Sequence, residues 1–488
     1  MILKHISKQT LGSEKKALKL AKKGYKNIPA YQKFLDQSGV SSIESFSDLP
    51  ITNKKNYILK FKIEELIPKI GDKAYRIAKS SGSSGKSTYY FKSTENIGKD
   101  SLKLRIFLES NFQINHKPTL VIMALNYPAW GGSENLDLAL KNASSDIDYT
   151  FYTFSCGMDF DSIIDIITLL NCEVEQIVLI IVPSFIFLLQ ERAKTLGYEL
   201  PLHKLRYMVV GEFFPEEFRI NLQNKAQILA EEPFLYSFYG STETTNLGAE
   251  SLASICMRKI LCQNPSFAEN FGFSETIPSL LHFSSKDTFI EVTEEGILVT
   301  KWQSTPLFRY FIGDRVSLYS WRDLKQNFLK VAVDYEIYGK LLNIIKNSSD
   351  YLPDILAIEG RSDKCLILGG VNVYQDSLNT IIRSQELEDI LTGIYYAKII
   401  YHENGQQALQ LVLETKTPIS AEKEKDLYTF FIRGLCEIQT DLREDWKVIY
   451  NDWENNDVNN RILALQFHLY PKLSQELFNK NKHQGILP

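Results

Sequence analysis

The sequence predicts an α/β fold: a mostly parallel sheet covered by helices, followed by short antiparallel strands. Through the first half of the chain, apolar strand-like runs alternate with helical stretches, which is typical of a parallel sheet with helices on both faces. After Glu250 the pattern changes to short strand-like runs. At 488 residues the chain exceeds what one hydrophobic core usually supports, so we expect two or three domains.

The expected elements follow in chain order. A helical apolar pattern covers residues 14–39. The expected strands of the parallel sheet are residues 120–125, 149–154, 178–182, 207–210 and 234–238, and the helices between them are residues 134–141, 162–170, 185–193 and 215–229. The expected antiparallel strands are residues 280–283, 289–292, 297–300 and 315–319. Residues 320–357 follow neither period, and we expect a long irregular insertion there.

Composition excludes several classes of protein. A hydrophobic content of 44% with 12% aromatic residues indicates a folded globular chain. A net charge of −4 provides no basic field, so we expect no nucleic-acid partner. The longest apolar run, residues 177–189, is too short to span a bilayer and contains Pro183, so we expect no membrane association. Without a signal-peptide core or a CxxC pair, we expect a cytoplasmic protein; the oligomeric state does not follow from the sequence.

Residues 80–88, with the sequence SSGSSGKST, carry hydroxyl groups, glycines and a lysine. Such groups bind polyphosphates through backbone N–H groups, hydroxyls and a cation. The pattern is not that of a P-loop NTPase, because the first glycine of that motif would have to stand at Ser80. A flexible Gly/Ser linker is the alternative that this composition leaves open.

Two further motifs follow strands of the expected parallel sheet. The fourth strand leads into Gly211, Glu212 and Phe213, and the fifth into residues 239–243, with the sequence YGSTE. Ligands of open parallel sheets bind beyond the carboxyl ends of the strands. Ordinary strand-to-helix loops with capping residues are the alternative for each motif alone. Together with the Ser/Gly loop, the two motifs predict one nucleotide site.

Four motifs in order resemble the adenylate-forming superfamily, and most closely its phenylacetate–CoA ligase-like branch. The loop at 80–88 is similar to SSGTTGKPT of that branch, and residues 360–373 resemble its GRSDDxLIIRGVNV. Residues 239–243 and 306–314, the latter with the sequence PLFRYFIGD, complete the series. The segment 29–54 also looks like the opening of that branch.

The resemblance implies a two-step reaction and two domains. A carboxylic acid, expected to be aromatic, attacks the α-phosphate of Mg-ATP to form an acyl-adenylate, and a thiol, most simply that of CoA, then displaces AMP. ATP, Mg²⁺ and CoA are the implied cofactors. The implied domains are an adenylation core at residues 1–360 and a smaller mobile α+β domain at 361–488, with a hinge near Asp363.

The resemblance also implies residue roles. Glu243 would bind Mg²⁺, Thr242 would contact the α-phosphate, and Asp314 with Arg361 would contact the ribose. The implied nucleotide-binding residues are Ser80, Ser81, Gly82, Ser83, Ser84, Gly85, Lys86, Gly211, Glu212, Phe213, Tyr239, Gly240, Ser241, Asp314 and Arg361. The alternatives are a turn residue for Asp314, a helix N-terminal carboxylate for Glu243 and a surface ion pair for Arg361 with Asp363.

The adenylation lysine of the family lies near the C-terminus, where its charge would stabilise the transition state. Lys482 has the best spacing and Lys480 is the second candidate; an ordinary solvated lysine is the alternative. The chain departs from the family where Ser87 replaces a proline and Gly369 replaces a basic residue. These departures weaken the implied use of CoA more than the implied adenylation.

The acid pocket is expected where a strand ends in Tyr127, Trp130, Gly131 and Gly132, which resemble a Gly-Gly segment of the relatives. An aromatic edge with two glycines would admit a flat ring. An aromatic core residue beside a glycine turn is the alternative.

Three functions therefore remain open. The first is a ligase that forms a thioester with CoA, and the second is an adenylating enzyme that loads a carrier-protein thiol or forms an amide. The third is a relative that binds nucleotide or acyl ligand without turnover, against which Glu243, Asp314 and Arg361 argue. Pyrophosphate release with and without CoA separates the three.

Overall fold

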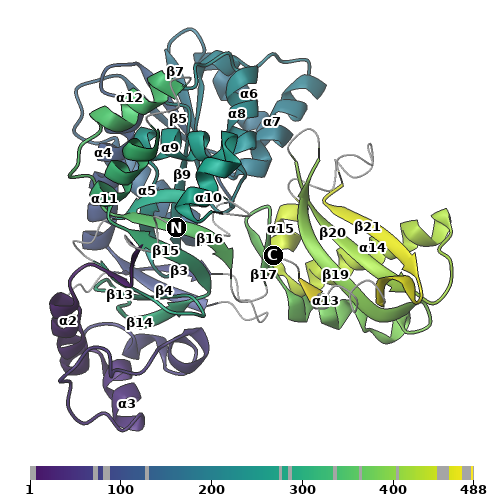
Figure 1. Cartoon of the computed structure of the whole chain (residues 1–488), viewed down its shortest axis with the longest axis horizontal. Helices are drawn as coiled ribbons and strands as arrows, with labels where there is room; N and C mark the ends of the chain where they lie inside the picture. The colour runs from purple at the N-terminus through teal and green to yellow at the C-terminus, as the bar shows by residue number, and fades with distance from the viewer. Residues whose placement is uncertain are drawn as a thin grey trace.

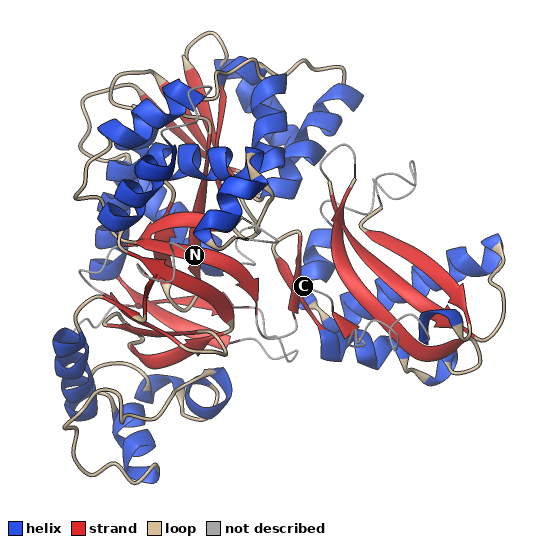
Figure 2. Ribbon diagram, viewed as in Figure 1, coloured by secondary structure: helices blue, strands red, loops and turns tan. Residues whose placement is uncertain are grey.

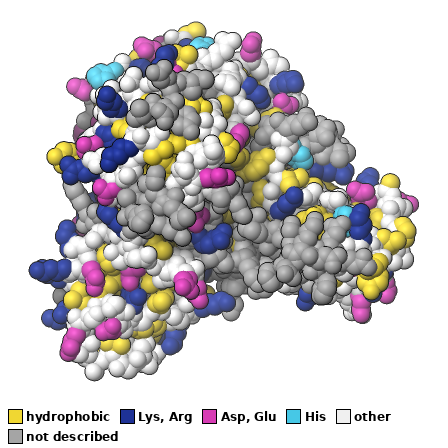
Figure 3. Space-filling model, in the orientation of Figure 1, with side chains coloured by type: hydrophobic (Ala, Val, Ile, Leu, Met, Phe, Trp, Pro, Cys, Tyr) yellow, Lys and Arg dark blue, Asp and Glu magenta, His cyan; other side chains and the backbone are white. Residues whose placement is uncertain are grey.

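The computed structural model describes most of the chain. The described residues are 7–69, 75–80, 88–126, 131–273, 277–283, 288–332, 338–361, 365–402, 406–447, 461–474 and 485–486. Figure 1 shows a larger body that contains the N-terminal elements and a smaller one that contains the elements from β17 onward. Acidic and basic side chains are interspersed over the face shown in Figure 3.

The N-terminal segment forms two helices where the sequence predicted one over 14–39. Helix α2 covers Glu14–Asn27 and α3 covers Pro29–Gln37. Ile28 between them is extended, with φ −110° and ψ 106°, because a residue before proline disfavours the helical region. Pro29 then begins α3, where its missing N–H costs no hydrogen bond.

The predicted parallel strands are present and form half of a ten-stranded sheet. In the order β9-β8-β7-β5-β6, each pair of neighbours is parallel. These strands are β5 (Thr119–Ala124), β6 (Phe151–Ser155), β7 (Gln176–Ile181), β8 (Leu205–Val209) and β9 (Leu235–Ser241). Helices lie on both sides of them in Figure 2. The alternating pattern thus correctly predicted the α/β class.

The other half of this sheet is antiparallel and continues directly from β9 in the order β10-β11-β16-β15-β1. Its strands are β10 (Thr245–Ala249), β11 (Ser279–Phe283), β16 (Ile355–Arg361), β15 (Asp314–Tyr319) and β1 (Ser7–Lys8). A second antiparallel sheet contains β14 (Leu307–Ile312), β13 (Ile297–Lys301), β12 (Thr288–Val292) and β2 (Thr10–Leu11), and a hairpin contains β3 (Tyr75–Ser80) and β4 (Thr88–Ser93).

The described part of residues 320–357 is regular, so the expectation of an irregular insertion is wrong there. Two helices and the strand β16 occupy most of this segment, and Trp321, Phe328 and Ile345 are buried. Phe328 packs against Phe267 with ring centroids 5.0 Å apart, which fixes the segment on its neighbours. The helices of the larger body after α3 are α4 (Thr94–Phe112), α5 (Gly131–Ala143), α6 (Phe160–Leu170), α7 (Pro183–Thr195), α8 (Glu216–Lys225), α9 (Leu252–Gln263), α10 (Pro265–Phe271), α11 (Trp321–Val331) and α12 (Gly339–Asn347).

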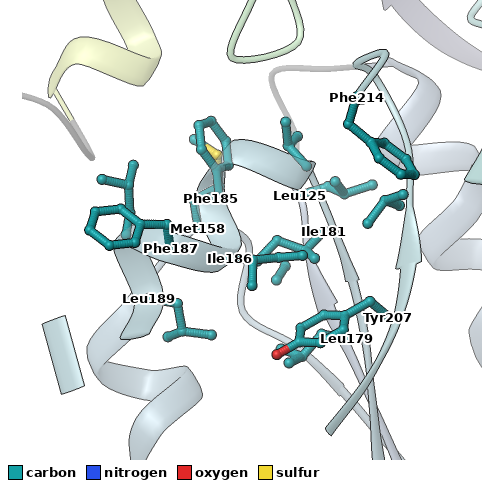
Figure 4. Packing of buried hydrophobic residues seen from close by; sticks show 14 of the residues in the cluster. Leu125, Met158, Leu179, Ile181, Phe185, Ile186, Phe187, Leu189, Tyr207 and Phe214 are labelled. Carbon is teal, nitrogen blue, oxygen red and sulfur yellow. The ribbon is translucent and has the colours of Figure 1, made fainter. Parts of the chain in front are cut away.

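The core of the larger body lies on the parallel strands. Every residue of β7 is buried, since helices cover both of its faces. Figure 4 shows Phe185 and Ile186 of α7 packed near Leu125 and Ile181, where the strands end. Burial of a side chain of this size contributes about 1.5–3 kcal/mol. This packing fixes the strand ends that carry the candidate site.

The smaller body is α+β. Its four-stranded sheet has the order β21-β20-β19-β22, beside a hairpin of β17 and β18. Its elements are β17 (Cys365–Leu368), β18 (Val371–Tyr374), α13 (Gln375–Ile382), β19 (Leu391–Tyr401), β20 (Gln407–Thr415), α14 (Ala421–Ile438), α15 (Thr440–Asp445), β21 (Leu463–Leu469) and β22 (Gly485–Ile486). Short helical turns elsewhere are Lys54–Ile58, Ile63–Glu65, Leu202–Lys204 and Gln385–Leu387. Within the described ranges, no helix combines the length and apolarity needed to cross a membrane.

Candidate active site

Thr242 and Glu243 lie in the tight turn between β9 and β10. Glu243 is therefore not a helix N-terminal carboxylate, because an antiparallel strand follows it instead of a helix. Gly240 is required here, since a Cβ at this position would lie 2.2 Å from the carbonyl oxygen of Thr245. We call the segment 241–245 the Glu243 turn.

Three side chains, two from the strands β4 and β13 and one from the loop that follows β13, bind successive carbonyl groups of the Glu243 turn. The Lys92 ammonium donates to the Thr242 carbonyl at 2.8 Å. The Gln303 amide donates to the Glu243 carbonyl at 2.5 Å, and the Lys301 ammonium to the Thr244 carbonyl at 2.6 Å. The sequence analysis missed these residues, although Lys92 within an otherwise hydroxyl-rich and aromatic strand was a signal that it has a buried partner.

The Glu243 carboxylate accepts a hydrogen bond from the Tyr90 hydroxyl at 3.0 Å and is partly exposed. Burial and the nearby carboxylate raise the pKa of Tyr90 well above its ordinary value, so this hydroxyl stays a donor. No group of three or more His, Cys, Asp or Glu residues that could hold a metal occurs among the residues described. One carboxylate suits Mg²⁺ that is bound mainly through substrate phosphates, so the donor set fits Mg-ATP.

Tyr239, Asp314 and Arg361 come together at the edge of β9, β15 and β16. The Tyr239 hydroxyl donates to the Asp314 carboxylate, which is largely buried. Asp314 pairs with Arg361 in the antiparallel register of β15 and β16. Asp314 is 75 positions from Tyr239 and 47 positions from Arg361 in the sequence, yet the fold makes it a neighbour of both. Such proximity is required if the three residues share one nucleotide site.

The segment Gly211–Phe213 follows β8. Gly211 has φ +89°, a left-handed conformation that glycine adopts without strain. The Glu212 carboxylate is buried and accepts hydrogen bonds from the Ser184 N–H and hydroxyl, each at 3.0 Å. Glu212 thereby accepts a hydrogen bond from an N–H group in the first turn of α7. The N-cap residue of α7 makes no side-chain hydrogen bond of its own. Both Glu212 oxygens already accept hydrogen bonds from the protein. A ligand beside this segment would therefore contact its backbone and the Phe213 side chain.

A buried cluster of four charged residues lies behind this segment. Arg219 contacts Glu216 at 3.2 Å and Glu250 at 2.5 Å, and Arg258 contacts Glu216 at 3.1 Å. Arg258 also donates to the Phe214 carbonyl at 2.7 Å. All four charged side chains are at most 1% exposed, so each charge depends on its partners. The cluster connects α8, α9 and the end of β10 to the segment after β8.

The smaller body contacts the larger one just after the carboxyl ends of β5 and β8. The Asn126 amide, just after β5, donates to the Asp445 carboxylate at 2.7 Å. The Tyr401 hydroxyl donates to the Phe213 carbonyl at 3.2 Å. Backbone N–H groups of Gly369 and Gly370, in the β17–β18 turn, bond to Glu212 and oppose the rise of its pKa. Burial nevertheless raises the pKa of Glu212 to about 7.

Gly131 and Gly132 begin helix α5 and do not form a loop. A Cβ on Gly131 would lie 2.4 Å from the Lys79 carbonyl oxygen, so glycine lets α5 approach β3. A Cβ on Gly132 would lie 3.8 Å from the Thr242 hydroxyl oxygen. The two glycines therefore lie between the β3–β4 hairpin and the Glu243 turn. Tyr127 and Trp130, the other residues predicted for the acid pocket, lie outside the described residues.

The Ser/Gly loop connects paired strands. Ser80 ends β3 opposite Thr88, which begins β4, so residues 80–88 close a hairpin and do not link two domains. Residues 81–87 lie outside the described residues, as do the predicted hinge Asp363 and the lysine candidates Lys480 and Lys482.

This architecture is the fold of the adenylate-forming ligases. The chain is similar to a solved 2-hydroxyisobutyryl-CoA ligase in complex with 2-HIB-AMP and CoA in the thioesterification state, with 12% identity, 96% of this chain and 92% of that chain covered, and a TM-score of 0.55. No family model matches the sequence. No curated protein matches it either.

Two other solved structures are more distant. The amide bond synthetase McbA from Marinactinospora thermotolerans has 11% identity over 86% of this chain and 72% of that chain, with a TM-score of 0.42. The o-succinylbenzoate CoA synthetase MenE from Bacillus subtilis has 13% identity over 72% of this chain and 61% of that chain, with a TM-score of 0.39. At these identities the likeness concerns the fold alone.

Proposed function

We propose that this protein is an ATP-dependent ligase that activates an aromatic carboxylic acid as its acyl-adenylate and transfers the acyl group to a thiol, that of CoA. The observation that carries the proposal is the convergence of the Glu243 turn with the Tyr239–Asp314 pair at one sheet edge. In this proposal, Glu243 serves a metal-bound triphosphate, and Asp314 serves a ribose. The adenylate-forming fold supports the same chemistry.

In the first step, a carboxylate oxygen of the acid attacks the α-phosphorus of ATP, and pyrophosphate leaves with the electrons of the broken P–O bond. Glu243 would hold Mg²⁺, and the ion would neutralise charge on the phosphates. Thr242 would contact the α-phosphate, and residues 80–88 would enclose the β- and γ-phosphates. Asp314 accepts hydrogen bonds from the ribose hydroxyls, and Arg361 contributes a second contact there.

In the second step, a thiolate attacks the acyl carbon, and AMP leaves with one oxygen of the original carboxylate. We propose that a C-terminal domain of residues 361–488 rotates about a hinge near Asp363 between the steps. Lys482 would approach the α-phosphate during adenylation. The contacts of Tyr401 and Asp445 with the strand ends support a domain that reaches the site.

CoA is the proposed acceptor because the solved ligase of the same fold carries CoA and an acyl-adenylate in its crystal. A carrier-protein thiol or an amine is the second candidate, since Gly369 stands where relatives of the phenylacetate–CoA ligase-like branch have a basic residue. We propose that the acid pocket lies beside Gly131 and Gly132. We also propose that the protein belongs to the phenylacetate–CoA ligase-like branch and that it is located in the cytoplasm.

Pyrophosphate release tests the proposal. The purified chain is incubated with Mg-ATP and a panel of aromatic and aliphatic acids, with and without CoA. We expect release with at least one aromatic acid, and acyl-CoA with AMP only when CoA is present. Stable acyl-AMP in the presence of CoA would favour the carrier-protein or amine acceptor. No release with any acid would favour a non-catalytic ligand-binding protein.

A further inference from the structure

A cavity adjoins the Glu243 turn and is lined by basic side chains. It has a volume of about 330 Å³, within the range of ligand pockets, on the order of 300–1,000 Å³. Its walls come from helices α2 and α4 and from the strands that support the turn. Glu243, Asp314 and Glu212 do not belong to its described lining, so this cavity is distinct from the proposed nucleotide site.

The cavity concentrates positive charge. Its lining includes the six lysines Lys16, Lys19, Lys92, Lys99, Lys103 and Lys301. Asp100 is the one carboxylate among the described residues that line it. Lys99 has an ion pair with Glu95, which compensates part of this charge at the rim. The described lining therefore contains more basic than acidic side chains, and the low-dielectric walls of a concave site focus the field of such charges.

Two of these lysines are buried at the inner end, which distinguishes the cavity from an ordinary solvated lysine surface. Lys92 is 5% exposed and Lys301 is 7% exposed. The Lys92 ammonium donates to the Thr242 carbonyl, and the Lys301 ammonium donates to the Thr244 carbonyl and to the Thr245 hydroxyl. Burial lowers the pKa of Lys92 to about 8, as expected where a charge is incompletely compensated.

The rest of the lining combines hydroxyl and amide side chains with two aromatic residues and the aliphatic residues Ala17 and Leu20. Trp302 and Phe289 contribute rings, and the Lys23 ammonium lies 3.6 Å from the centre of the Trp302 ring. Lysines bind phosphate groups as point charges, and aromatic faces accept a planar or aliphatic group. We propose that this cavity binds a small molecule that carries several phosphate charges and an apolar part. Because Lys92 and Lys301 also bind the Glu243 turn, the ligand contacts the groups that position this turn.

Calorimetric titration of the full chain with inorganic triphosphate tests the proposal. The pocket variant combines Lys16→Gln, Lys19→Gln and Lys103→Gln. The matched control combines Lys15→Gln, Lys22→Gln and Lys26→Gln, which removes the same charge from exposed positions of α2 outside the lining. A second pocket variant, Lys99→Gln with Lys103→Gln, changes α4 alone. Equal melting temperatures establish that all variants are folded.

We expect the two pocket variants to weaken a triphosphate site by about tenfold or more, and the control by less than about twofold. Absence of binding to the unmodified chain would overturn the proposal. Equal weakening in pocket and control variants would overturn it as well, because only net charge would then matter. The titration requires no acid substrate or turnover. Triphosphate bound at the proposed nucleotide site would be weakened neither by the pocket variants nor by the control, so selective weakening in the pocket variants reports on the cavity alone.

Discussion

The Glu243 and Asp314 carboxylates each accept a hydrogen bond from a tyrosine hydroxyl that the sequence alone does not connect to them. The Tyr90 hydroxyl donates to Glu243 and the Tyr239 hydroxyl to Asp314, across separations of 153 and 75 positions. Each carboxylate is thereby oriented while remaining near a strand end. Substitution of either carboxylate therefore tests what it binds.

Replacement of Glu243 by Gln keeps its size and removes the charge that we propose as a ligand of Mg²⁺. We expect adenylation, measured as acid-dependent pyrophosphate release, to fall by about 100-fold or more. The melting temperature should change little, because the carboxylate is partly exposed. Activity within about threefold of the unmodified enzyme would show that Glu243 is not a metal ligand.

Replacement of Asp314 by Asn would weaken the proposed hydrogen bonds from the ribose hydroxyls, since the charge of the acceptor is lost. We expect the KM for ATP to rise about tenfold, and the preference for ATP over 2′,3′-dideoxy-ATP to fall by a similar factor. Asp323→Asn, on the exposed surface of α11, serves as the control and should leave both values unchanged. An unaltered preference in Asp314→Asn would argue against a ribose contact.

At the scale of elements, the parallel strands were predictable because each is a continuous apolar run buried on both faces. Strand β10 was not predicted, because the sequence of Thr245–Ala249, TNLGA, has little apolar character. Helix α11 was missed although Trp321, Leu324 and Phe328 have helical spacing. The side chains that bind the Glu243 turn come from positions about 60 to 150 residues away, which no local pattern reveals.

The buried charge cluster should stabilise the packing of α8 and α9 on the segment after β8. Glu250→Gln leaves the charge of Arg219 without its closest partner, at 2.5 Å. We expect the free energy of unfolding in urea to fall by about 3–5 kcal/mol. Glu269→Gln, at an exposed position of α10, should change it by less than about 0.5 kcal/mol. A loss below about 1 kcal/mol for Glu250→Gln would mean that water compensates the cluster.

At the scale of the whole molecule, the two bodies meet at the strand ends through Glu212, Asn126 and Phe213. The residue-level resemblance correctly implied an adenylate-forming fold at an identity of 12% to the solved ligase. The acceptor, expected from the resemblance to be CoA, stays a prediction. Glu212 lies at this junction, which makes the junction sensitive to pH.

Glu212 has a pKa of about 7 in the folded protein, above the ordinary 4.5. The fold therefore favours the protonated carboxyl, and stability is lost as the pH rises from about 4.5 through about 7. We expect the free energy of unfolding to fall by up to about 3 kcal/mol over this interval relative to Glu212→Gln, which cannot ionise. Parallel pH profiles of the two proteins, measured by urea unfolding, would contradict the assignment.

The most direct test of the account follows the oxygen atoms of the acid. An accepted acid labelled with ¹⁸O in its carboxylate is converted with Mg-ATP and CoA, and the products are analysed by mass spectrometry. Attack of the carboxylate on the α-phosphorus predicts one ¹⁸O in AMP and none in pyrophosphate. Formation of ADP with label in inorganic phosphate, or of AMP without label, would contradict an acyl-adenylate intermediate.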